Sequence, residues 1–139
     1  MPYLFTPLHI DIARNSCDDF NLFHDKHKWH QIENNPFSGP IVLGFQLEML
    51  IEGEIKKYRS AKHEYPVIDD EGLIYSNYQF SFANAVKPQQ HVEVKIMPSK
   101  FKIDGSNSIL ANRVSVKADD KLCMMGYKKE SKFPLFLSD

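Results

Sequence analysis

The sequence predicts an α+β fold in which a curved antiparallel sheet wraps around one long central helix. Two patterns lead to this fold class: residues 40–64 carry apolar side chains at helical spacing, and residues 73–130 alternate between apolar and polar side chains. An apolar helix and a set of half-buried strands each need a partner layer, and packing one on the other satisfies both. The 139 residues fit a single domain, which we assign to residues 1–139.

The first 40 residues have little regular pattern, with prolines at positions 2, 7, 36 and 40. Residues 9–21 predict a short helix, because Ile10, Ala13 and Cys17 recur on roughly one face. The stretch NNPFSG at 34–39 predicts a loop, because it is rich in asparagine, proline and glycine.

Residues 40–64 predict the central helix. The positions with helical spacing are Leu43, Leu47, Leu50, Ile51, Ile55 and Tyr58, and Phe45 and Met49 add apolar surface on other faces. A helix that is apolar on most sides is buried, so we expect its first half to lie inside the protein. The second half is polar and charged, and we expect it to emerge into water.

Four segments between residues 73 and 130 have the alternation of strands. They are residues 73–82, 91–103, 108–118 and 122–129, with a turn at 118–121 (ADDK) between the last two. The first segment places Tyr78, Phe80 and Phe82 on one face. We therefore expect about four antiparallel strands after the helix.

The composition narrows the class of protein. A net charge of −1 provides no electrostatic argument for binding nucleic acid or an anionic membrane. No stretch approaches the roughly 20 apolar residues that span a bilayer, and no export signal opens the chain. Cys17 and Cys123 lie among apolar neighbours and are expected to be buried free thiols, which together with the missing signal favours the cytoplasm.

Residues 18–24 (DDFNLFH) combine three polar side chains, Asp19, Asn21 and His24, with three large apolar ones. This segment, followed by FSGPIVLGFQLEML at 37–50, resembles the MaoC-like (R)-specific enoyl-CoA hydratases, which have the hot-dog fold. In that family a D-x-N-P-x-H segment precedes an apolar helix opened by an I-x-H-G-type stretch, and residues 41–44 match the latter.

The resemblance covers roughly residues 18–130. Residues 78–96 resemble the strand, turn and long strand that follow in the family, and residues 112–127 resemble its final hairpin. The chain departs from the family at Leu22, where the family has proline, and at Leu43, where the family has histidine. Its N-terminus also leaves little room for the family's first strand.

The resemblance implies a chemistry for these residues. Asp19 and His24 would hold one water between them and move its proton, a form of catalysis worth about 10²- to 10⁴-fold. The backbone N–H of Gly44, at the start of the helix, would stabilise the negative charge on the thioester oxygen. Asn21 would brace the loop. The apolar residues Leu43, Leu47 and Ile51 would line the substrate pocket.

The resemblance also implies a substrate and a partner. We expect a hydro-lyase acting on 2-enoyl or 3-hydroxyacyl chains carried by coenzyme A or acyl carrier protein, without a cofactor. Because the family's sites lie near a dimer interface, and because a single hot-dog domain leaves a sheet edge to be covered, we expect a homodimer.

Two other functions fit the sequence. A hot-dog thioesterase would use an acid on the central helix, such as Glu48, to direct water at the carbonyl. A non-catalytic acyl-binding or assembly protein would accommodate the departures at Leu22 and Leu43. Related dehydratases pair a helix acid with a histidine before the loop, where this chain has Asn35 and Pro36, and Glu52 is expected at the start of the exposed half of the helix.

Two further groups of side chains have simple interpretations. His24, His27 and His30 have an H-x-x-H-x-x-H spacing, but no cysteine or glutamate stands at a metal-ligand spacing, so we expect a solvated polar segment and no metal site. A basic set is interpreted as solvated surface, with contact to the phosphates of coenzyme A or to a carrier protein as the alternative. Its members are Lys56, Lys57, Arg59, Lys62 and Lys87.

Overall fold

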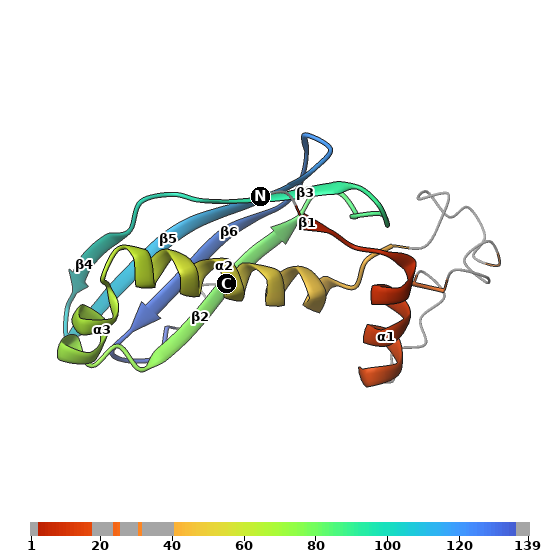
Figure 1. Ribbon diagram of the computed structural model, residues 1–139. Helices are drawn as coiled ribbons and strands as arrows, with labels where there is room; N and C mark the ends of the chain where they lie inside the picture. Colours follow the sequence, from red (N-terminus) through yellow and green to blue (C-terminus); the bar gives the residue numbers. More distant parts are fainter. Residues whose placement is uncertain (1–2, 18–23, 26–30, 32–40, 136–139) are drawn as a thin grey trace.

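The computed structural model describes residues 3–17, 24, 25, 31 and 41–135 (Figure 1). In chain order the elements are β1 (Tyr3–Leu4), α1 (Pro7–Cys17), α2 (Gly44–Ala61), α3 (Tyr65–Glu71), β2 (Tyr75–Phe82), β3 (His91–Ile96), β4 (Lys100–Asp104), β5 (Asn107–Ala118) and β6 (Lys121–Ser131). No helix within these residues is both long and apolar enough to cross a membrane.

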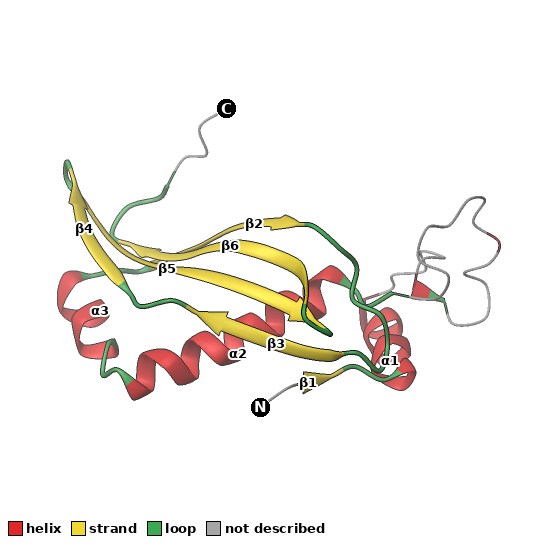
Figure 2. Cartoon of the chain, turned by 90° about the horizontal axis from the view of Figure 1, so that it is seen from above, coloured by secondary structure: helices red, strands yellow, loops and turns green. Residues whose placement is uncertain are grey.

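One antiparallel sheet and the long helix α2 make up the body of the protein. Five of the six strands in the described residues follow the order β1-β3-β5-β6-β2, and the sixth, β4, pairs with β5 beyond the end of β3. Figure 2 shows α2 running along one face of the curved sheet, with α1 at one end and α3 at the other. The α+β plan expected from the sequence is thereby confirmed.

The helix α2 begins at Gly44, four residues later than the sequence pattern indicated. Leu43 is extended (φ −67°, ψ 142°) and Val42 lies outside the helix, where its N–H donates to the carbonyl of Val86 (N···O 2.8 Å) in the connection between β2 and β3. The side-chain oxygen of Gln46 accepts the N–H of Leu43 (3.0 Å), which stabilises the first turn of the helix.

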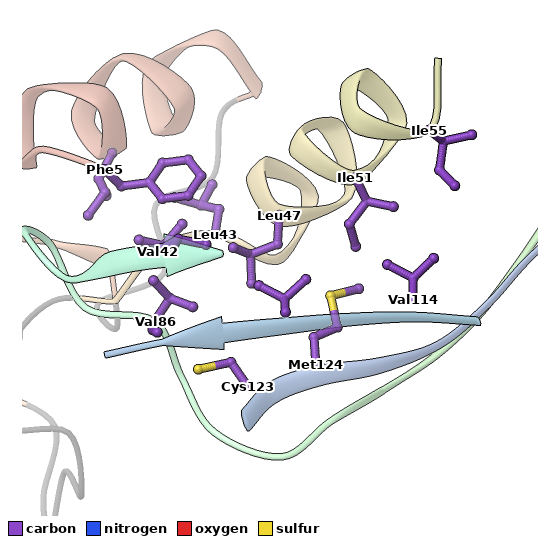
Figure 3. Close-up of a cluster of buried hydrophobic side chains, with 14 residues drawn as sticks. Phe5, Val42, Leu43, Leu47, Ile51, Ile55, Val86, Val114, Cys123 and Met124 are labelled. Carbon is purple, nitrogen blue, oxygen red and sulfur yellow. The ribbon is translucent and has the colours of Figure 1, made fainter. Parts of the chain in front are cut away.

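The core lies between α2 and the sheet (Figure 3). Leu47, Ile51 and Ile55 form the buried stripe of α2 and pack over sheet residues that include Val114 and Met124. Only this stripe of the first half is buried, because Phe45 is 40% and Met49 69% exposed, so the expectation that the first half lies inside the protein on most sides is wrong. Cys123 belongs to this core as a free thiol, and burial raises its pKa from the ordinary value of 9.0, so it stays protonated at neutral pH.

The second half of the helix does not emerge into water on all sides, contrary to the expectation. Ile55 and Arg59 are both buried, and Arg59 is only 1% exposed. The short helix α3, which the sequence analysis missed, lies at this end of α2 (Figure 2). Glu64, which immediately precedes α3, pairs with Arg59 (2.8 Å).

The segment 91–103, expected as one strand, is divided into β3 and β4. Ile96 pairs with Val114, and Lys100 pairs with Ala111. Between these two pairs the chain advances four residues from β3 to β4 but only three residues along β5. One extra residue in a strand is a bulge. Proline at position 98 has no N–H to donate to the ladder, and the side-chain amide of Asn112 bonds the carbonyl of Met97 (3.0 Å) in the gap.

The first strand of the sheet is only two residues long. Tyr3 pairs with Val92 and Leu4 with His91. The helix α1 begins at Pro7 and extends at least to Cys17, so it starts two residues before the expected helix, and residues 18–21 of that expectation lie outside the described residues.

Candidate functional site

A pocket of about 390 Å³ opens at the amino end of α2. One wall is the segment that leads into the helix, and the other is the end of β2 with the connection to β3. The lining residues are His24, Ile41, Val42, Gly44, Leu47, Phe82, Ala83, Asn84, Ala85 and Val86. The lining is mostly apolar, and His24 is the titratable side chain among the described residues that form it.

His24 is half-buried and is oriented by the backbone. Its Nδ1 lies 2.8 Å from the carbonyl oxygen of Ile41. A carbonyl only accepts, so Nδ1 carries the proton in the neutral ring, and Nε2 is then the nitrogen with a basic lone pair. This hydrogen bond holds the tautomer that a general base requires.

An ion pair fixes the chain next to His24. Asp25 and Arg14 of α1 form it, with an Oδ2···Nη2 distance of 3.2 Å, and both side chains are mostly buried. Arg14 also lies 3.5 Å from Asp11 on its own helix. The sequence provided no signal for this pair, since its members are eleven positions apart, a separation at which no local spacing pattern predicts a contact.

Gly44 is the first residue of α2, and its N–H has no carbonyl four residues earlier in the helix to receive it. A side chain would point into the pocket: a Cβ on Gly44 would lie 3.6 Å from Cζ of Phe82. The pocket therefore contains a helix N-terminus with a bare backbone at its first position, which favours partial negative charge on a ligand.

The predicted site residues fall into three groups. His24, Gly44 and Leu47 line the pocket together. Leu43 and Ile51 are fully buried in the core beside it, and neither is among the described residues that line it. Asp19 and Asn21 lie outside the described residues, so the pairing of Asp19 with His24 stays a prediction.

Phe82 and Asn84 line the pocket and were not singled out from the sequence. Phe82 is 57% exposed at the end of β2, and the side-chain amide of Asn84 donates to the carbonyl of Leu122 (2.7 Å). The alternation of residues 73–82 marked Phe82 only as an apolar strand position. Its contact with the helix depends on how β2 and α2 are placed by the fold.

The helix glutamates considered for the thioesterase and dehydratase alternatives are not among the residues that line this pocket. Glu48 is exposed on α2, and Glu52 is half-buried with its Oε2 3.9 Å from Nζ of Lys128. Arg59 was grouped with solvated basic residues, and that interpretation is wrong because Glu64 and the core enclose it. No group of three potential metal ligands occurs among the residues that the structure describes, and His27 and His30 lie outside them.

Comparison with known proteins identifies the fold through solved structures rather than through sequence matches. No protein-family profile and no curated protein sequence match the chain. Among solved structures it is similar to the (R)-hydratase from A. caviae involved in PHA biosynthesis, with 18% identity, a TM-score of 0.62 and coverage of 96% of this chain and 92% of that one.

Two other solved structures are similar over 96% of this chain and 87% of their own. They are a monoamine oxidase regulatory protein from Archaeoglobus fulgius, with 15% identity and a TM-score of 0.66, and the ChsH1-ChsH2 complex from Mycobacterium tuberculosis, with 14% identity and a TM-score of 0.59. These similarities confirm the hot-dog fold.

Proposed function

We propose that this protein is a hydratase or dehydratase of acyl thioesters, adding water to a 2-enoyl chain or removing it from a 3-hydroxyacyl chain. The observation that carries the proposal is the pocket in which a backbone-oriented histidine and the bare N-terminus of α2 face the same space. The fold shared with an (R)-hydratase supports it.

The proposed reaction uses these groups as follows. The thioester oxygen accepts the N–H of Gly44, and losing one such donor costs about 2.7–4 kcal/mol in enzymes where it has been removed. His24 and Asp19 hold a water beside C3. Its oxygen bonds to C3, and one of its protons passes to His24 or Asp19 and from that pair to C2, so that the double bond becomes a single bond and both catalytic groups return to their starting state.

The apolar residues have a supporting role in this scheme. Leu47 lines the pocket and excludes water from the acyl chain, while Leu43 and Ile51 pack behind it. Asn21 is proposed to brace the loop that carries Asp19. The acyl group is carried by coenzyme A or by acyl carrier protein.

One assay tests the reaction and separates it from the alternatives. The protein is mixed with crotonyl-CoA while enoyl absorbance and free thiol are followed together. A hydratase lowers the absorbance without releasing thiol, and a thioesterase releases thiol. Binding with neither change would identify a non-catalytic acyl-binding protein and would contradict the proposal.

Substitution of the two polar residues tests their roles. His24→Ala and Asp19→Asn are each expected to lower kcat by at least about 10²-fold, because each removes a group that moves the proton. Phe133→Ala serves as a control, since this exposed aromatic lies outside the lining of the pocket. Wild-type rates in either variant, with an unchanged melting temperature, would rule out that residue.

A further inference from the structure

Phe82 stands where the pocket meets the surface. It is the last residue of β2, and its ring lies against the first residue of α2, with Cζ and Cε1 3.6 and 3.9 Å from the position of a Cβ on Gly44. These are ordinary van der Waals distances. The ring therefore forms the pocket wall immediately beside the N–H that is proposed to bind the thioester oxygen.

His24 lines the same pocket at the other end of the segment that runs from Ile41 to Gly44. It is bound to the carbonyl of Ile41, whereas Phe82 packs against Gly44 three residues further on. Three residue steps span at most about 10 Å, and the hydrogen bond from Val42 to Val86 holds this segment in place. His24 and Phe82 line the same pocket, whose volume of about 390 Å³ leaves room for a short enoyl group with one water.

We propose that Phe82 selects acyl chains that are unbranched at C2. This inference rests on the proposed function, because it uses Gly44 as the site of the thioester oxygen. With that oxygen at Gly44 and the water at His24, C3 faces the histidine and C2 lies beside the ring of Phe82. A methyl group on C2 would occupy the volume of the ring.

The experiment compares the binding of butyryl-CoA with that of 2-methylbutyryl-CoA, using calorimetry so that no turnover is needed. The wild-type protein is expected to bind the unbranched ester at least about tenfold more tightly than the branched one. One carbon group that a fitted pocket accepts or rejects changes affinity by about that factor or more. Phe82→Ala should bring the two dissociation constants close to each other. Phe82→Leu, which retains more of the side-chain volume than alanine, should give an intermediate ratio.

Tyr75→Ala is the matched control. Tyr75 is an aromatic residue of the same strand with 41% exposure, and it is not among the lining residues of the pocket. The control should retain the wild-type ratio. A wild-type protein that binds both esters equally, or a Phe82→Ala variant that keeps the full preference, would overturn the role of Phe82. Failure of the wild-type protein to bind either ester would overturn the proposed function itself.

Discussion

At the scale of single residues, two glycines illustrate how the same added methyl group has different consequences. Gly126 of β6 pairs with Phe80 of β2, and a Cβ there would lie 1.9 Å from the backbone oxygen of Gln79 and 2.7 Å from Cδ1 of Phe80. Among the described residues, a Cβ on Gly44 would meet the ring of Phe82, at an ordinary contact distance. The first glycine is required for packing, whereas the second leaves space in the pocket.

We therefore expect opposite results from alanine at these positions. Gly126→Ala should lower the free energy of unfolding by at least about 2 kcal/mol, because backbone atoms cannot move aside as a side chain can. Gly44→Ala should leave that free energy within about 0.5 kcal/mol of wild type but reduce hydratase turnover about 10²-fold by covering the proposed donor. Urea unfolding and the crotonyl-CoA assay measure the two effects. Equal losses of stability would contradict this assignment.

At the scale of elements, the carboxyl half of α2 is attached to the rest of the protein by charges. Arg59 lies 2.8 Å from Glu64 and 3.8 Å from Glu130 of β6. Lys128, also buried, lies 2.9 Å from Glu130 and donates to the hydroxyl of Ser76 on β2. This charge cluster joins the carboxyl half of α2, and Glu64 just before α3, to β6 and β2.

Removing Arg59 should be costly because its carboxylate partners remain. Arg59→Met is expected to lower the free energy of unfolding by about 3 kcal/mol, the typical effect of leaving a buried charge without its partner. Lys57→Met is the control, because Lys57 is 78% exposed and its pair with Glu54 (3.4 Å) should contribute under about 1 kcal/mol. Similar losses in the two variants, measured in urea, would show that the burial of Arg59 has no energetic importance.

At the scale of the whole molecule, β2 presents an edge that no described strand covers. It pairs with β6 on one side, and Tyr75, Tyr78 and Phe82 are exposed along it. The N–H of Ala83 donates to Cys123 of β6, so by the alternation of antiparallel ladders the N–H of Tyr78 points to the open edge. We propose that a second copy of the chain pairs there, close to the mouth of the pocket.

Such a homodimer should have twice the 16.1 kDa mass of one chain in sedimentation equilibrium. Tyr78→Pro should dissociate it, because proline removes the outward N–H without removing a bond to β6. Tyr78→Ala keeps that N–H and should weaken the dimer less. A wild-type protein that sediments as a monomer at micromolar concentration would contradict the proposed edge pairing.

Local patterns were sufficient for much of the fold. The helical spacing of Leu47, Ile51 and Ile55 and the alternation in the strands depend on positions close together in the sequence. The break between β3 and β4 has a local signal in Pro98, whereas the burial of Arg59 depends on its pairing with Glu64, which no apolar spacing records. The seven-residue helix α3 is too short to have a clear period.

The candidate site divides in the same way. His24 and Gly44, which line the pocket, were predicted site residues through the resemblance of residues 18–50 to the MaoC-like hydratases, whereas Phe82 and the pair of Arg14 with Asp25 were not predicted. By itself, the sequence determined the α+β class, the buried stripe of the central helix and the polar residues available for chemistry, because apolar periodicity and side-chain chemistry are properties of neighbouring positions. Only the tertiary structure decided which of them meet, since the pocket forms where residues 24, 41–47 and 82–86 are brought together by packing α2 onto the sheet.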